Sequence, residues 1–259
     1  MDEFAALANR MADKAGEIIK TYFRQPFDVE RKDDDSPVTI ADREVEKALR
    51  EMIKTERPDD GILGEEFGIE ESKTGFTWVI DPIDGTKSFM IGRPTFGTLI
   101  ALCEGTTPKL GVIDQPISQE RWIGIEGQQT TFNGQPVKTA PCTDFHDAKI
   151  GSTSPTMFQK LTDYGRAWEL FETTGNRFSW GGDCYMYGLL ASGFVDIVFE
   201  EDLSPYDFAA LIPVVKGAGG HITDWRGDEL TLESKGQVIA LGDPNLWPDI
   251  ERMIRKSPY

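Results

Sequence analysis

The sequence of 259 residues predicts an α+β fold. Three observations predict it: two amphipathic helical patterns open the chain, a series of short β-rich runs follows, and strands then alternate with helices. No internal repeat or long flexible linker separates these parts. We therefore expect a single compact unit, 1–259, in which an N-terminal half, 1–145, and a C-terminal half, 146–259, pack together.

The first element expected is a helix of about six turns, because apolar residues recur at spacings of three and four from Phe4 to Phe23. A second helix is expected after Asp42, where Val45, Leu49 and Ile53 share one face. A polar, charged connection over 31–37 separates the two helices.

The period changes from Thr77 onward, where short runs are rich in β-branched and aromatic residues. These runs are separated by Gly, Pro or Thr and lie at 78–80, 96–103, 110–113 and 121–125. Asn133-Gly134 is typical of a tight hairpin turn. This region is predicted to form a β-meander.

The second half is expected to alternate between strands and helices. Ser204-Pro205 is typical of a helix start, with a capping serine and a proline at the first helical position. Strands are predicted at 149–152, 194–199 and 237–241, and helices at 155–164, 184–192, 204–217 and 246–255.

The chain is strongly acidic, with 44 Asp and Glu against 27 Lys and Arg and a net charge of −17, which argues against a nucleic-acid partner. No apolar run approaches the roughly 20 residues of a membrane span, and the first residues do not resemble a signal peptide. The three cysteines form no CxxC pair, which favours a reducing compartment, and we expect the cytoplasm. With only two histidines, catalysis would depend mainly on carboxylates.

The sharpest local feature is the segment WVIDPIDGTKS, in which an apolar strand is expected to end at Asp81, Pro82 to turn the chain, and Asp84 to precede Gly85. Two carboxylates and the Ile83 carbonyl would then lie close together, and Mg²⁺ prefers such oxygen ligands. The N–H groups of Gly85 and Thr86 at a helix start suit a phosphate. The alternative is an ordinary capped turn, because DP and DG pairs are common there.

Three further acidic residues stand in short motifs that have simple structural explanations on their own. Glu65 lies in the acidic pair of GEEFG, which alone suggests a solvated loop. Asp207, in SPYDFAA, and Asp42, in PVTIAD, are most simply acidic residues in the first turn of a helix, where the helix dipole favours them.

Taken together and in this order, PVTIAD, GEE, DPIDGTKSF, GGD, YDFAA and AGG resemble the inositol monophosphatase superfamily of Mg²⁺-dependent, lithium-sensitive phosphomonoesterases, over 36 to about 225. Through TKSFMIGRPTFGTLIAL, GGDCYMYGLLASG and SPYDFAAL the chain is most similar to the histidinol-phosphate phosphatase branch. The resemblance implies a layered α/β/α/β/α sandwich of the inositol monophosphatase and fructose-1,6-bisphosphatase type, with antiparallel sheets, and a homodimer.

The resemblance also implies a role for each motif residue, with two or three Mg²⁺ in the site. Glu65, Asp81 and the Ile83 carbonyl would bind one ion, and Asp81, Asp84 and Asp207 a second. Asp42 and Thr86 would orient the attacking water, which makes them catalytic together with Glu65. The implied contacts to substrate come from Asp84, Gly85, Thr86, Arg177, Asp183, Glu200 and Asp207.

Two cations about 4 Å apart can activate a water and neutralise a phosphate in an in-line displacement, so no covalent nucleophile is needed. Asp183 and Glu200 fall where the family contacts the alcohol part of the substrate. An acidic wall would attract an ammonium and an imidazole, which favours hydrolysis of L-histidinol phosphate to L-histidinol and phosphate, a step of histidine biosynthesis.

Several alternatives stay open at this point. The substrate could be inositol 1-phosphate or a broader set of sugar and polyol phosphates, and a non-enzyme alternative is an inactive acidic binding or regulatory module. Asp183 could instead cap a helix beginning at Cys184, and 200–202 could be a solvated strand end. Either Arg177 or Ser179 could touch the substrate phosphate.

Overall fold

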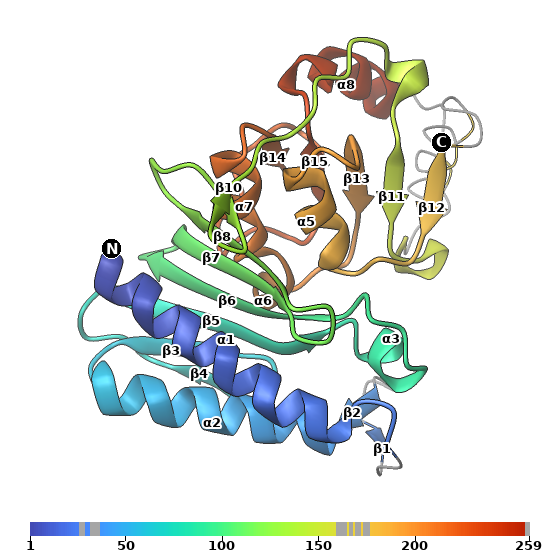
Figure 1. Ribbon diagram of the computed structural model, residues 1–259. Coiled ribbons are helices and arrows are strands. Elements are labelled where there is room, and N and C mark those ends of the chain that lie inside the picture. Colours follow the sequence, from blue (N-terminus) through green and yellow to red (C-terminus); the bar gives the residue numbers. More distant parts are fainter. Residues whose placement is uncertain are drawn as a thin grey trace.

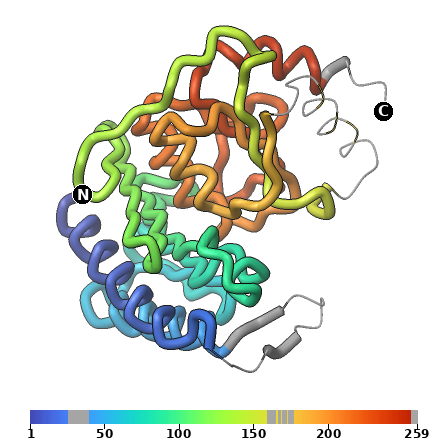
Figure 2. Tube along the Cα trace, turned by 45° about the vertical axis from the view of Figure 1, so that its right-hand side comes forward, coloured from blue at the N-terminus to red at the C-terminus, as the bar shows by residue number. Residues whose placement is uncertain are grey.

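The computed structural model describes residues 1–25, 29–31, 37–158, 165, 168, 172 and 177–256. Its elements stack in five layers: two long helices, an eight-stranded sheet, a layer of short helices, a five-stranded sheet and an outer helix (Figure 1). The predicted layered α+β sandwich is confirmed. In Figure 2 the blue-to-green part of the chain and the orange-to-red part form two neighbouring bodies that pack against each other.

The first layer consists of α1 (Asp2–Tyr22) and α2 (Ile40–Glu56), as the sequence predicts. Both helices bury one apolar face against the first sheet, α1 on β6 and β7 and α2 on β5. A separate two-stranded pair, β1 (Val29–Arg31) with β2 (Pro37–Thr39), lies between them in the chain. Of the polar connection expected over 31–37, residues 32–36 lie outside the described part.

The eight-stranded sheet contains the predicted meander. Its strands, in spatial order, are β10 (Gln135–Pro136), β9 (Thr131–Phe132), β8 (Glu120–Ile125), β7 (Thr107–Gln115), β6 (Gly97–Glu104), β5 (Phe76–Asp84), β3 (Gly61–Gly64) and β4 (Gly68–Glu70). Asn133 and Gly134 form the expected turn between β9 and β10, both with positive φ.

The expectation of antiparallel sheets is confirmed for most strand pairs but not for all of them. β3 pairs parallel to β5, because β4 first folds back antiparallel on β3 and the chain then returns along the other side of β3. In the second sheet β11 runs parallel to both β12 and β13. Both sheets are therefore mixed.

The middle layer contains α5 (Tyr185–Ala191), α6 (Pro205–Phe208) and α7 (Leu211–Gly217), whereas α3 (Thr86–Met90) lies beside β2 at the end of the first sheet (Figure 1). The single helix expected over 204–217 is two helices. Pro213 has no N–H to donate to the carbonyl of residue 209, so the hydrogen-bond ladder is interrupted at the junction. α7 packs closely on the first sheet, because a Cβ at Gly111 would lie 2.0 Å from the Ala210 carbonyl oxygen.

The second sheet has the order β12 (Phe178–Trp180), β11 (Ile150–Ser152), β13 (Ile197–Glu200), β15 (Val238–Leu241) and β14 (His221–Thr223). Apolar residues of α8 (Trp247–Lys256) pack over its outer face. Short 3₁₀ turns occur at Phe145–Asp147, Pro155–Met157 and Pro244–Leu246. The helix predicted for 155–164 begins as the second of these turns, and 159–164 lie outside the described residues.

One apolar cluster fills the space between the two sheets around α5, α6 and α7, and a second lies between the first sheet and helices α1 and α2. The junction between the sheets is thus a continuous packed core. Within the described ranges, none of the helices has the length and apolar character that a membrane crossing requires.

Candidate metal and phosphate site

The site is built around an irregularity in β5. Asp81 pairs with Leu99 of β6 and Asp84 pairs with Gly97, so three steps along β5 oppose two steps along β6. Side chains alternate between the two faces of a regular strand, so Asp81 and Asp84 would otherwise point to opposite faces. The extra residue of this bulge brings both aspartates to the face that carries the middle helices.

The sequence prediction that the strand ends at Asp81 is therefore wrong in detail, because β5 continues to Asp84. Pro82 has no N–H for the sheet ladder, and its carbonyl accepts a hydrogen bond from Thr98 Oγ1 at 2.8 Å. The prediction that Asp81 and Asp84 lie close together is confirmed by the structure.

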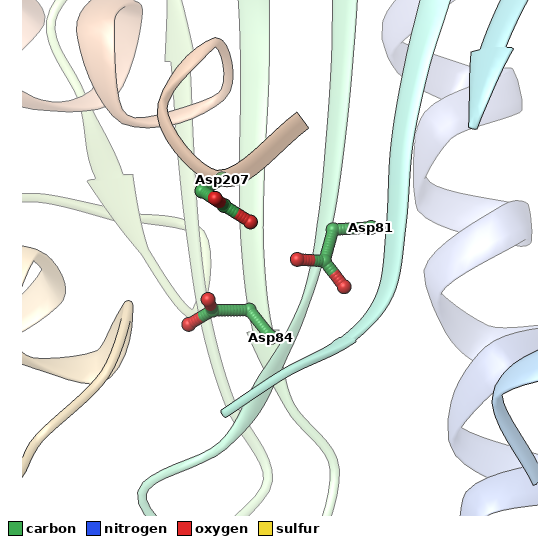
Figure 3. Close-up of side chains that lie close together, drawn as sticks. All are labelled: Asp81, Asp84 and Asp207. Carbon is green, nitrogen blue, oxygen red and sulfur yellow. The ribbon is translucent and has the colours of Figure 1, made fainter. Parts of the chain in front are cut away.

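Asp207 comes to the same place from α6. Single carboxylate oxygens of Asp81, Asp84 and Asp207 all lie within 4.8 Å of one another, and the three side chains gather around one space (Figure 3). Asp207 Oδ2 accepts a hydrogen bond from the Ser204 backbone N–H at 2.6 Å, which fixes its carboxylate at the helix start. The C-terminal half therefore contributes an essential part of the cluster.

Burial and mutual repulsion hold the pKa values of these carboxyl groups high. Burial raises the pKa of Asp81 well above its ordinary range, and the neighbouring charges of Glu65, Asp84, Asp207 and Asp42 raise it further. Burial and the charges of Asp183 and Asp207 also raise the pKa of Asp84. Burial raises the pKa of Asp207 to about 7. Uncompensated negative charge is thus concentrated here, and a cation would relieve it.

The residues present fit a divalent cation. Asp81 Oδ1 is buried and has no hydrogen-bond partner among the residues that the structure describes, which is costly for a carboxylate oxygen unless a cation binds it. All the candidate metal ligands of the cluster are carboxylate oxygens, which hard cations such as Mg²⁺ prefer. The predicted ligand Glu65 and the predicted catalytic residue Asp42 both lie near enough to raise the pKa of Asp81, so the structure brings them to the cluster.

The predicted phosphate-binding segment follows β5 directly. Thr86 begins α3, and its hydroxyl donates a hydrogen bond to the Ile83 carbonyl at 3.1 Å. Gly85 has a φ of 82°, and a Cβ there would lie 2.6 Å from Cγ of Asp183. Only glycine permits this close approach, which places Asp183 beside the predicted phosphate-binding backbone.

A cavity of about 120 Å³ adjoins the cluster. Asp84 and Asp207 belong to both, and the polar wall of the cavity also includes Thr153, Asp183, Tyr187 and Glu200. Glu200 is buried and accepts hydrogen bonds from the Thr153 N–H at 2.9 Å and the Tyr187 hydroxyl at 2.8 Å. The alternative that 200–202 is a solvated strand end is therefore wrong for Glu200.

Asp183 does not cap α5 with its side chain. It has a φ of 46°, and its Oδ2 instead accepts a hydrogen bond from Thr95 Oγ1 at 2.9 Å. Burial raises the pKa values of both Asp183 and Glu200. The wall of the cavity thus carries two more buried carboxyl groups, as the sequence predicted.

Arg177 is a predicted substrate contact that does not line the cavity. Its half-exposed guanidinium pairs with Asp147 at 2.8 Å and donates to the His146 carbonyl. Thr95, Thr153 and Tyr187, which orient the acidic wall, were missed because hydroxyl and backbone donors carry no motif of their own.

A family model described as the inositol monophosphatase family matches residues 1–256. A bifunctional phosphatase named IMPL2 from Arabidopsis thaliana is 48% identical over 93% of this chain and 69% of its own. A histidinol-phosphatase from Chlorobaculum parvum is 37% identical over 90% of each. The solved structure of an inositol monophosphatase from Zymomonas mobilis superposes with a TM-score of 0.89, at 43% identity and 98% coverage of both chains. These similarities agree with the acidic site, and the chain belongs to the inositol monophosphatase family of phosphoric monoester hydrolases.

Proposed function

We propose that the protein is a Mg²⁺-dependent phosphatase that hydrolyses L-histidinol phosphate to L-histidinol and phosphate, a reaction of histidine biosynthesis. The family is metal-dependent, and the cluster of Asp81, Asp84 and Asp207 is compatible with a metal. Glu65 and the Ile83 carbonyl complete the proposed ligand set, with two or three ions per site. Mg²⁺ would supply charge neutralisation for the phosphate and would lower the pKa of the attacking water.

The chain's own residues would orient the reacting groups. The Thr86 hydroxyl already donates to Ile83, so its oxygen is left to accept a hydrogen bond from a water. Asp42 lies near Asp81 and can accept a hydrogen bond from the other O–H of that water, which would hold the nucleophile in line with the phosphorus. The backbone N–H groups of Gly85 and Thr86 would donate to the phosphate oxygens.

The observation that carries the choice of substrate is the acidic wall of the adjoining cavity. Asp183 and Glu200 are buried, and they line the same cavity as Asp84 and Asp207. An ammonium group beside them would favour their charged forms and form charge-assisted hydrogen bonds, which are roughly twice as strong as neutral ones. A neutral polyol would bring no positive charge to these two buried carboxyl groups.

The alternative substrate is inositol 1-phosphate, which the 43% identity to a solved inositol monophosphatase supports. Phosphate release from L-histidinol phosphate, inositol 1-phosphate and a simple sugar phosphate, measured side by side, separates the two. We expect kcat/KM for histidinol phosphate to exceed the others by about 10-fold or more, the effect of one charged hydrogen bond. Equal or faster hydrolysis of inositol 1-phosphate would exclude the histidinol assignment.

A homodimer in the cytoplasm is part of the same proposal. The three cysteines are buried and free, which is consistent with a reducing compartment. Light scattering of the purified protein tests the dimer directly.

Arg177 forms an ion pair with Asp147 on the surface. It stays a proposed substrate contact only in a conformation in which this ion pair is broken.

A further inference from the structure

Helix α2 carries a buried polar stripe on the side that faces the metal cluster. Asp42, Glu46 and Arg50 are spaced four residues apart and so lie one above the other. Their exposed fractions are 1%, 0% and 6%. The proposed mechanism uses only Asp42, so the burial of a second carboxylate and an arginine on the same stripe needs another explanation.

Glu46 holds the turn that carries Glu65. Its Oε2 accepts a hydrogen bond from the Glu66 N–H at 2.7 Å, and its Oε1 accepts one from the Phe67 N–H at 3.1 Å. These are the two backbone donors that follow Glu65 in the turn between β3 and β4. Figure 1 shows α2 beside β3 and β4. The Glu46 carboxylate on α2 therefore determines where that turn lies.

Arg50 holds Glu46 and the next strand together. Its Nε donates to Glu46 Oε1 at 2.7 Å, its Nη1 donates to Glu70 Oε1 at 2.9 Å, and its Nη2 donates to the Gly68 carbonyl. Both ends of the β3–β4 hairpin are thus connected to one face of α2.

Close packing around Gly64 and a backbone hydrogen bond at Glu65 restrict the position of the Glu65 backbone. A Cβ at Gly64 would lie 2.0 Å from Glu46 Oε1 and 2.9 Å from Nη2 of Arg50. On the other side, the Glu65 N–H donates to the carbonyl of Ile80, the residue before Asp81, at 3.3 Å. Glu65 is therefore fixed between α2 and the strand that carries the aspartates.

We propose that Glu46, oriented by Arg50, is a positioning residue for the metal site: it places Glu65 without touching metal or substrate. The inference rests on the proposed metal-dependent function. Stability alone gives a weak reason for this buried ion pair, because apolar side chains of similar volume often stabilise a core as well or better. Substitution of residues that hold metal ligands in place, in contrast, commonly lowers metal affinity or activity by about 10- to 100-fold.

The test compares Glu46→Gln with a matched control, Asp60→Asn, in the full-length protein. Asp60 is also buried and accepts hydrogen bonds from Arg57 Nε at 2.9 Å and Trp78 Nε1 at 3.2 Å, but it precedes β3, whereas Glu65 follows it. Both substitutions place an amide N–H₂ group against donors and should lower the thermal midpoint in EDTA. Mg²⁺ binding without substrate is then measured by calorimetry.

We expect Glu46→Gln to raise the Mg²⁺ dissociation constant by about 10- to 100-fold and Asp60→Asn to change it by less than about 2-fold. Arg50→Lys, which keeps the charge but loses the fork of donors, should show a smaller increase of the same sign and replaces Glu46→Gln if that variant does not fold. Unchanged Mg²⁺ affinity in Glu46→Gln, or an equal loss in Asp60→Asn, overturns this inference alone. If the unmodified protein binds no Mg²⁺, the proposed function fails as well.

Discussion

The backbone N–H of Cys184 donates a hydrogen bond to Asp84 Oδ2 at 2.6 Å, although 100 positions separate the two residues. Asp84 lies at the end of β5 in the first sheet, and Cys184 immediately precedes α5, which packs against the second. Hydrogen bonds to a carboxylate are strong and directional, so this contact sets the orientation of Asp84. The geometry of the acidic cluster therefore depends on how the two halves of the chain pack.

Asp84→Asn should stabilise the metal-free protein and abolish its response to Mg²⁺. The amide oxygen can keep the bond to Cys184, while the substitution removes a charge that burial and the nearby Asp183 and Asp207 disfavour. We expect the thermal midpoint in EDTA to rise by about 2 to 4 °C, the shift that about 1 kcal/mol produces in a chain of this size. Thermal melting with and without Mg²⁺ measures both effects.

Asp114→Asn is the control for that experiment. Asp114 is buried and Arg121 pairs with it at 2.6 Å, so the substitution removes the buried one of two carboxylate partners of that guanidinium, the other being Asp13, and should lower the midpoint. An Asp84→Asn protein that melts earlier in EDTA and still gains stability from Mg²⁺ would contradict the description of this cluster.

Stabilisation by Mg²⁺ should increase with pH between 6 and 8. The pKa of Asp207 is about 7 in the metal-free fold and 3.8 ordinarily, so its contribution to metal-free stability is present below 3.8 and is lost as pH rises through about 7. Mg²⁺ binds the deprotonated carboxylate, so protons compete with it below pH 7. The shift in thermal midpoint caused by Mg²⁺, measured at pH 6, 7 and 8, should grow; a shift that is largest at pH 6 would refute this expectation.

Asp42→Asn should lower kcat by about 10- to 100-fold or more, in the range seen when groups behind a metal site are lost. An amide can still fill the space at the start of α2, but it accepts a proton from the attacking water less well than a carboxylate. Steady-state phosphate release at saturating Mg²⁺ measures the effect. Unchanged turnover would remove Asp42 from the mechanism.

Asp183→Asn should impair hydrolysis of histidinol phosphate selectively. The Thr95 hydroxyl can still donate to the amide oxygen, so the wall of the cavity should keep its shape while it loses a countercharge for the substrate ammonium. We expect kcat/KM for histidinol phosphate to fall by about 10- to 100-fold, the effect of one hydrogen bond to a charged group. Hydrolysis of inositol 1-phosphate should change little.

Asp196→Asn is a suitable control, because it also removes a buried carboxylate, which lies next to β13, the strand that carries Glu200. Asp196 accepts a hydrogen bond from the Lys149 N–H at 2.8 Å just before β13 begins, whereas Glu200 lies at the other end of that strand. The control should leave both activities unchanged. An equal loss on both substrates in Asp183→Asn would show that this residue serves the common phosphate chemistry.

Long periodic patterns in the sequence predicted their elements well, because a helix such as α1 repeats its apolar spacing over 21 residues. The acidic residues that meet at the cluster were also predictable, since each stands in a motif whose order along the chain is distinctive. Short strands were harder: β3 and β4 flank Glu65 with four and three residues, too few to show a period.

The bulge in β5 and the role of Glu46 could not be predicted, for two physical reasons. A bulge depends on the partner strand, so the register of Asp84 against Gly97 is not visible in the local sequence. A glutamate within a helix ordinarily faces solvent, so Glu46 looks like a surface residue. Its spacing of four from both Asp42 and Arg50, beside the apolar residues Val45 and Leu49, would have indicated burial.

Asp81, Asp84 and Asp207 together are expected to bind divalent cations. Anomalous diffraction from a crystal soaked in Mn²⁺, which prefers the same oxygen ligands as Mg²⁺, tests it most directly. We expect at least one anomalous peak within about 2 to 2.5 Å of carboxylate oxygens from these residues. A crystal that takes up Mn²⁺ elsewhere and shows no peak between these three carboxylates would contradict it.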